Sequence, residues 1–168
     1  MSNIRNATIE DLADIVNIYN QAISKGFQTA DISPVKIEER KLWFEEHSHC
    51  HYPIYVYIDK NEVVGWLSIS PYRKGREALR FTAEVSYYID ENHQKQGIGS
   101  RLLQHAIQDM PKLGLKTLFA ILLDVNQGSK RLLEKFGFDR WGYLPNIAEF
   151  KGQMCGQFYY GFQIKDEK

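Results

Sequence analysis

The stretch QKQGIG places two glycines, Gly97 and Gly99, directly before a segment with the apolar periodicity of a helix. A glycine-rich turn that opens into a helix directs unpaired backbone N–H groups, and the positive end of the helix dipole, at one point. Such a point favours an anion, typically a phosphate group. The glycines let the backbone approach a ligand closely, and Gln94, Lys95 and Gln96 add hydrogen-bond donors. The loop therefore predicts a phosphate-binding site.

Two common phosphate-binding motifs do not fit this loop. A nucleotide triphosphatase loop needs Gly-Lys-Ser/Thr at the helix start, but Gly99 is followed by Ser100 and Arg101. The dinucleotide fingerprint needs a third glycine where Leu102 stands, within an early βαβ unit. Taken alone, the two glycines are equally compatible with a tight helix entry, so the surrounding elements must decide.

The composition predicts a single soluble domain whose balanced charge indicates no strongly charged partner. The 168 residues are 43% hydrophobic, which is enough for one core, and we expect a single domain over residues 1–168. Lys plus Arg and Asp plus Glu both number 21, which favours neither nucleic acid nor a membrane as a partner. Cys50 and Cys155 have no framework spacing, and the N-terminus does not resemble a signal peptide. We therefore expect a cytoplasmic protein with reduced thiols.

Hydrophobic periodicity predicts the elements that position the glycine loop. The order is strand, two helices, three strands, then helix, strand, helix and two terminal strands, which is an α/β fold with a sheet of mixed direction. A break at Lys60–Asn61 suggests a hairpin between the first two of the three central strands. The predicted ranges are strand 4–8, helices 9–23 and 35–48, strands 53–59, 61–70 and 79–90, a helix from Ile98, strand 115–124, helix 128–138, and strands 140–152 and 157–164.

The ordered set of motifs resembles a known family. Gln94, Gly97 and Gly99 follow the strand AEVSYYI and precede a helix, a buried strand, Asn126 and the segment EKFGF. This order resembles the acetyl-CoA-binding core of the GNAT N-acetyltransferases. Segments along nearly the whole chain, such as TAEVSYYID and GYLPNIAEFKG, are similar to the phosphinothricin and methionine sulfoximine acetyltransferase branch. The resemblance implies a single-domain GNAT fold, in which helices flank a mixed central sheet with splayed middle strands.

The resemblance also implies a co-substrate, acetyl-CoA, and no metal. In this family the glycine loop holds the coenzyme A pyrophosphate by backbone amides, and the strand before it contacts the pantetheine arm and can polarise the thioester carbonyl. The positions that match the family's cofactor contacts are Ser86, Tyr87, Tyr88, Gln94, Lys95, Gln96, Gly97, Ile98, Gly99 and Asn126. Direct transfer in a ternary complex needs no acyl-enzyme, so Cys155 is not expected to act as a nucleophile.

Glu84 occupies the family's glutamate in TAEVS and is the candidate general base, with a second role in contacting the substrate. A partly buried carboxylate can have its pKa raised toward neutrality, which suits removal of a proton from an ammonium group. The alternative is an ordinary solvent-facing strand carboxylate. Phe27 and Thr29 resemble the branch's loop over the substrate cleft, and Tyr72 and Arg73 align approximately with its substrate loop.

The loop SPYRKGREALRF brings four basic residues close together in sequence: Arg73, Lys74, Arg76 and Arg80. A guanidinium can hold a carboxylate or phosphinate by paired hydrogen bonds, which favours a small amino acid or an analogue as substrate. A solvated basic loop is an equal alternative. The substrate is thus expected to be the primary amine of a small molecule. A protein or peptide substrate, or a non-catalytic acyl-CoA-binding module, remains the alternative function.

Several features depart from the family or offer other chemistry. Many GNAT enzymes carry a tyrosine, able to protonate the departing thiolate, where this chain has Leu133, so no general acid is assigned. The segment HSHCHYP could suggest a metal site, but its ligands are crowded without zinc-like spacing, which favours a helix terminus instead.

Since terminal strands and exposed aromatics form dimers in this family, we also expect a homodimer.

Overall fold

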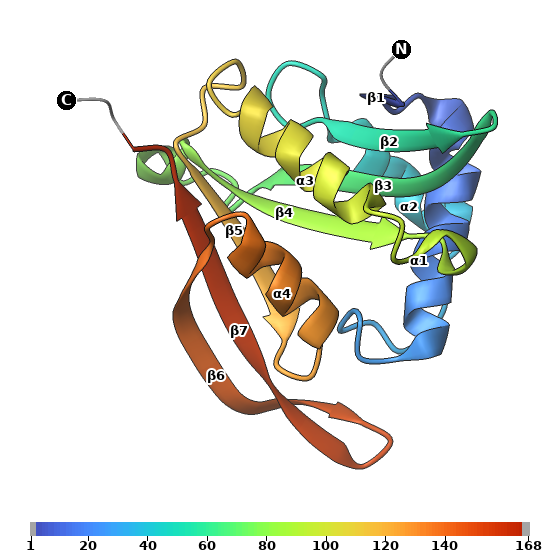
Figure 1. Cartoon of the computed structure of the whole chain (residues 1–168), viewed down its shortest axis with the longest axis vertical. Coiled ribbons are helices and arrows are strands. Elements are labelled where there is room, and N and C mark those ends of the chain that lie inside the picture. The colour runs from blue at the N-terminus through green and yellow to red at the C-terminus, as the bar shows by residue number, and fades with distance from the viewer. Residues whose placement is uncertain (1–2, 166–168) are drawn as a thin grey trace.

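The computed structural model describes residues 3–165, whose strands form one sheet with the order β1-β2-β3-β4-β5-β7-β6 (Figure 1). β4 and β5 are parallel and every other neighbouring pair is antiparallel, so the predicted α/β fold with a mixed sheet is confirmed. The strands are β1 Ile4–Asn6, β2 Ile54–Asp59, β3 Glu62–Pro71, β4 Thr82–Ile89, β5 Thr117–Leu123, β6 Asp139–Phe150 and β7 Gln153–Gln163. The helices are α1 Leu12–Lys25, α2 Ile37–Glu45, α3 Ile98–Asp109 and α4 Gln127–Lys135, in the chain order predicted above.

α1 and α2 lie on one face of the sheet. The apolar positions of α1 recur at three- and four-residue steps, and Ile15, Ile18 and Ile23 are all buried against β2 and β3. Ile9, the first residue of the predicted helix 9–23, is 46% exposed, because residues Ile9–Asp11 form a 3₁₀ turn before the helix begins. The carboxylate of Asp11 accepts a hydrogen bond of 2.8 Å from the Thr8 backbone N–H, which fixes this entry.

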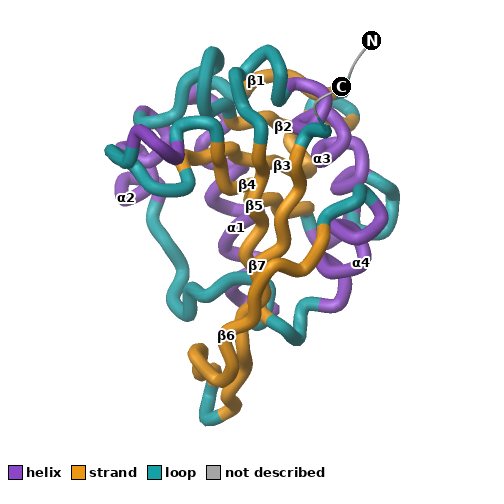
Figure 2. Tube along the Cα trace, turned by 90° about the vertical axis from the view of Figure 1, so that its left-hand side faces the viewer, coloured by secondary structure: helices purple, strands orange, loops and turns teal. Residues whose placement is uncertain are grey.

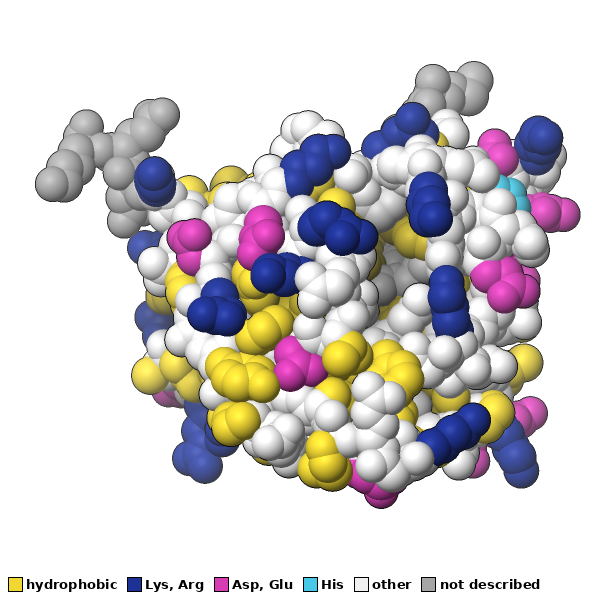
Figure 3. Space-filling view, turned by 60° about the horizontal axis from the view of Figure 1, so that its bottom comes forward, with side chains coloured by type: hydrophobic (Ala, Val, Ile, Leu, Met, Phe, Trp, Pro, Cys, Tyr) yellow, Lys and Arg dark blue, Asp and Glu magenta, His cyan; other side chains and the backbone are white. Residues whose placement is uncertain are grey.

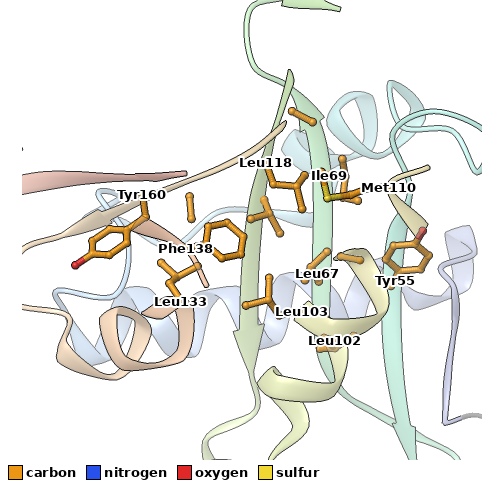
Figure 4. Close-up of a cluster of buried hydrophobic side chains, with 14 of the residues drawn as sticks. Tyr55, Leu67, Ile69, Leu102, Leu103, Met110, Leu118, Leu133, Phe138 and Tyr160 are labelled. Carbon is orange, nitrogen blue, oxygen red and sulfur yellow. The ribbon is translucent and has the colours of Figure 1, made fainter. Parts of the chain in front are cut away.

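α3 and α4 cover the opposite face and enclose the larger core (Figure 4). Leu102 and Leu103 on α3, Leu118 on β5 and Leu133 on α4 have no exposed surface. Burying each leucine contributes on the order of 1.5–3 kcal/mol, so these contacts fix both helices against the sheet. The first turn of α3 therefore has a defined position relative to β4, the strand that precedes the glycine loop.

β4 and β5 separate after a short paired stretch. Their pairing covers Thr82 to Glu84 on β4 opposite Thr117 to Phe119 on β5, and β5 continues by pairing with β7. β4 instead continues alongside β3 as far as Ile89. The backbone of β4 beyond Glu84 thus has no neighbouring strand on its β5 side. The splayed middle strands that the family resemblance implied are present.

β6 and β7 form a long hairpin that extends away from the rest of the molecule (Figures 1 and 2). β6 is an edge strand with mostly exposed residues, among them large apolar ones. The exposed apolar side chains of this hairpin are Trp141, Tyr143, Leu144, Ile147 and Met154. Within residues 3–165, no helix combines the length and apolar character needed to cross a membrane.

Candidate active site

The glycine loop forms a cradle at the start of α3. Gly97 has φ of +79°, a conformation that favours glycine, and a Cβ placed there would meet no atom within 4 Å. At Gly99 a Cβ would lie 3.2 Å from Cδ2 of Leu132 on α4, so a side chain would push the two helices apart. The first-turn N–H groups of α3 have no carbonyl partner within the helix. The cradle therefore fits a phosphate group held by backbone donors.

Side chains from α1 hold this loop in place. The amide of Gln21 donates to the Asp90 carboxylate at 2.9 Å and accepts from the Glu91 backbone N–H at 2.9 Å. One turn later, Nζ of Lys25 donates to Oε1 of Gln94 at 3.1 Å. These contacts join segments about 70 residues apart, so the cradle is positioned by tertiary structure as well as by its own sequence.

A cavity of about 680 Å³ runs from the cradle into the opening between β4 and β5. Viewed from the hairpin end, Lys and Arg side chains stand on both sides of a hollow in the surface (Figure 3). Of the predicted cofactor residues, Gln96 does not line this cavity. The others all do: Ser86, Tyr87, Tyr88, Gln94, Lys95, Gly97, Ile98, Gly99 and Asn126, together with Phe27 from the predicted substrate loop. Arg131 of α4 also lines it and had not been predicted.

The wall formed by α4 carries hydroxyl and amide groups but no acid where the family tyrosine would stand. Oδ1 of Asn126 accepts from the Ser129 backbone N–H at 3.2 Å and caps the helix. The Tyr87 and Ser129 hydroxyls lie 2.8 Å apart, and burial raises the pKa of Tyr87 to about 12. Leu133 lines the cavity but is packed into the core beside Phe138 (Figure 4). Its side chain is fully apolar and cannot donate a proton.

A smaller cavity of about 320 Å³ adjoins the first, and Ser86 and Tyr88 line both. Glu84 lies in its wall on β4, two residues before Ser86. Burial raises the pKa of the Glu84 carboxyl above its ordinary value. Among the described residues, no hydrogen bond or ion pair reaches this carboxylate. A half-buried carboxylate without a partner is able to accept a proton from a molecule in the cavity.

The smaller cavity also contains a polar network that the sequence did not reveal. The Tyr19 hydroxyl donates to the Asp31 carboxylate and lies 2.8 Å from Oγ1 of Thr29. Arg40 of α2 approaches Asp31 at 3.5 Å and places its guanidinium 4.6 Å from the centre of the Tyr19 ring. Of these residues only Thr29 had been predicted. Tyr19 lies on the apolar face of α1, so its spacing indicated packing and gave no signal for its hydroxyl.

The second predicted substrate loop, which carries Tyr72 and Arg73, lies next to the site without lining either cavity. The Tyr72 ring stacks on Phe119 with centroids 4.8 Å apart, and Phe119 pairs with Glu84 across the sheet. The Arg73 guanidinium lies 6.0 Å from the Tyr72 ring. Lys74 forms an ion pair of 3.0 Å with Glu46 and is exposed. Contact of Tyr72 and Arg73 with a substrate stays a prediction.

The histidine-rich segment makes hydrogen bonds within the fold. Nδ1 of His47 lies 2.6 Å from the Trp43 carbonyl oxygen, and Nε2 of His49 lies 3.3 Å from the Ala7 carbonyl oxygen. Cys50 is exposed and free. Across residues 3–165, no three His, Cys, Asp or Glu side chains form a group that could hold a metal ion.

The positions of the cradle and of Glu84 suit a transferase. A donor whose phosphates are held at the start of α3 can extend along the opening between β4 and β5. Its reactive end then lies where the two cavities meet, near Glu84 in the wall of the smaller one. An acceptor in the smaller cavity would meet it there. The fold and site together therefore define a group-transfer enzyme that uses a long, phosphate-bearing donor.

Comparisons with known proteins identify that class. Residues 12–138 match the Acetyltransferase (GNAT) family, and the chain belongs to this family. It is an acetyl-CoA-dependent N-acetyltransferase. The chain is 43% identical to YwnH of Bacillus subtilis over 151 residues. This alignment covers 89% of this chain and 91% of YwnH.

Two further relatives bear on the donor and the acceptor. The L-methionine sulfoximine/L-methionine sulfone acetyltransferase of Pseudomonas paraeruginosa is 31% identical over 153 residues, covering 90% of this chain and 88% of that one. This chain is also similar to the crystal structure of a GNAT superfamily phosphinothricin acetyltransferase from Sinorhizobium meliloti in complex with AcCoA. The TM-score is 0.90 and the identity 26%, over 96% of this chain and 87% of that one. Acetyl-CoA is thus the co-substrate of this enzyme.

Proposed function

We propose that this enzyme acetylates the primary amine of a small amino acid or an analogue, of the phosphinothricin or methionine sulfoximine type. The amine attacks the acetyl group directly in a ternary complex, without an acyl-enzyme. The observation that carries the proposal is the unpartnered, half-buried carboxylate of Glu84 in the wall of the smaller cavity, two residues before Ser86, which lines both cavities. The names of the relatives support the choice of acceptor.

Each residue of the site has a distinct task in this proposal. The N–H groups at Gly97 and Gly99 hold the diphosphate of acetyl-CoA, and the free edge of β4 from Ser86 to Tyr88 holds the pantetheine arm. When bound, acetyl-CoA supplies an activated acetyl thioester. A backbone N–H of this edge polarises the carbonyl. Glu84 removes the proton that the ammonium must lose before its nitrogen can attack.

The smaller cavity supports a small, positively charged acceptor. Its volume of about 320 Å³ suits a molecule of amino-acid size rather than a folded segment of protein. Asp31 and Glu84 both line it, and their carboxylates attract an ammonium group. A peptide-acetylating enzyme would need a longer groove leading to Glu84.

The test follows thiol release while the purified protein turns over acetyl-CoA with a panel of amines. The panel contains the standard amino acids, methionine sulfoximine, phosphinothricin and a set of unblocked peptides. Turnover with small amino acids or the two analogues supports the proposal. Turnover with peptides alone would favour a protein acetyltransferase, and binding of acetyl-CoA without any turnover would favour a non-catalytic module.

We also propose that residues 1–168 form one domain that acts in the cytoplasm as a homodimer. The exposed apolar residues of the β6–β7 hairpin, including Trp141 and Ile147, support self-association because an apolar edge strand is rarely left uncovered. Cys50 and Cys155 are both free thiols, as expected in a reducing compartment. Light scattering on the wild type and Ile147→Lys tests the dimer: a mass of two chains should fall to one in the variant.

A further inference from the structure

We propose that Ser70 and His47 form a relay that removes from Glu84 the proton taken from each amine. The inference rests on the proposed function and extends it to residues outside the two cavities. The need for a relay comes from the position of Glu84. Once the ammonium has transferred its proton, the carboxyl group is neutral, half-buried and covered by the bound molecules. It must lose that proton before the next turnover.

The sheet places Ser70 beside Glu84. Ser70 of β3 and Glu84 of β4 are direct cross-strand partners, and their neighbours Ser68–Ser86 and Trp66–Tyr88 pair along the same face. Directly opposite residues have Cβ atoms roughly 5 Å apart. The Glu84 carboxylate has no hydrogen-bond partner among the described residues, so in the proposed relay it turns toward the neighbouring Ser70 hydroxyl.

The hydrogen bonds of His47 define its proton arrangement. A carbonyl oxygen can only accept, so Nδ1 of His47, 2.6 Å from the Trp43 carbonyl, carries a proton. Burial lowers the pKa of His47, and the neutral ring then has an unprotonated Nε2. This nitrogen lies 3.0 Å from Oγ of Ser70 and accepts its hydroxyl proton. The chain of donors therefore runs from Ser70 toward His47, which is the direction a departing proton needs.

The surroundings of His47 allow it to hold a proton briefly. Burial leaves the pKa of His47 lowered, and the hydrogen bond to the Trp43 carbonyl and the charge of the adjacent Glu46 oppose that shift. Lys74 pairs with the Glu46 carboxylate at 3.0 Å. The Trp43 ring lies 4.7 Å from the imidazole, centroid to centroid. Glu84 lies across Ser70, its cross-strand partner. His47 is only partly buried, so solvent reaches this residue.

The relay balances in protons and electrons. An N–H bond of the ammonium breaks, its electron pair stays on nitrogen, and the proton forms an O–H bond on Glu84. That proton then passes to Oγ of Ser70 while the serine's own proton moves to the Nε2 lone pair of His47. Glu84 is again a carboxylate, Ser70 is unchanged, and the imidazolium releases its Nε2 proton to water. No redox partner is required.

The experiment compares the wild type with His47→Gln, Ser70→Ala and a matched control, His49→Gln. His49 belongs to the same segment but contacts the Ala7 carbonyl, away from Glu84. We expect kcat to fall about tenfold in the first two variants, with the KM of acetyl-CoA and of the amine unchanged. Added imidazole buffer should restore kcat in these two, because it carries the proton away in place of the relay. The wild type and His49→Gln should not respond to the buffer.

A second measurement needs no substrate. Nitrogen-15 NMR of the wild type should show the neutral tautomer of His47 protonated on Nδ1. The proposal is overturned if this ring is protonated on Nε2 alone. It is equally overturned if His47→Gln and Ser70→Ala keep wild-type kcat, or lose activity without recovering it in imidazole. If one variant does not fold, the other carries the kinetic test. Failure of the proposed function is distinguishable, since the wild type itself would then acetylate no small amine.

Discussion

Replacing Glu84 by glutamine is the sharpest test of the site, because the two side chains have nearly the same shape and differ in the ability to accept a proton. The carboxylate lines the smaller cavity and has no partner among the described residues. General-base catalysis contributes roughly 10² to 10⁴ in rate. We therefore expect kcat to fall by about 10² or more, equivalent to about 2.7 kcal/mol of transition-state stabilisation. The affinity for coenzyme A should stay nearly unchanged.

The pH dependence has a definite sign. Because burial raises the pKa of Glu84, kcat/KM of the wild type should fall as pH drops through that raised value, where the base becomes protonated. The variant should lack this acidic limb. The same shift means that ionised Glu84 opposes folding at neutral pH, since the stability it contributes in the protonated form is lost as pH rises through the folded-state pKa. The variant should thus melt at or above the wild-type Tm at pH 7.

The assay measures thiol release over a range of pH, together with calorimetric titration of coenzyme A. Glu77→Gln is the control, because Glu77 is an exposed glutamate outside both cavities. It should keep wild-type kinetics. Near-normal turnover in Glu84→Gln would refute the role of this carboxylate as the base. An equal loss of coenzyme A affinity would instead show that the substitution disturbs the cofactor site.

Three further substitutions test separate parts of the structure. Gly97→Ala and Gly114→Ala both force alanine to a positive φ and should each cost about 1–2 kcal/mol of stability. Only Gly97 lines the larger cavity, so only its change should weaken coenzyme A binding about tenfold in calorimetry. Tyr19→Phe removes the hydroxyl that binds Asp31 and should raise the KM of the amine several-fold at constant KM for acetyl-CoA; unchanged kinetics would exclude this network from substrate binding. Leu133→Ala leaves a cavity in the core and should lower the free energy of unfolding by about 2–5 kcal/mol in denaturant titration.

Local pattern predicted most of the elements and the cradle. At the turn, Lys60 and Asn61 both have positive φ, a conformation that asparagine tolerates better than most residues, and the hairpin is present as predicted. The glycines before α3 likewise act through backbone geometry, which depends on near neighbours in the chain. The element boundaries were less accurate: α2 covers Ile37–Glu45 rather than 35–48, because helix ends depend on tertiary contacts.

Tertiary structure alone decided which residues line the smaller cavity. The smaller cavity brings Tyr19 of α1, Asp31 of a loop and Gln157 of β7 together with Glu84, although these residues are far apart in the chain. No periodicity within one element can report such a meeting, since it depends on how β4 and β5 separate and which segments fill the opening. The sequence by itself determined that a glycine-rich helix start follows a strand bearing a glutamate. The packing of distant segments decided that this glutamate is half-buried and faces a cavity of amino-acid size, because burial is a property of neighbours in space.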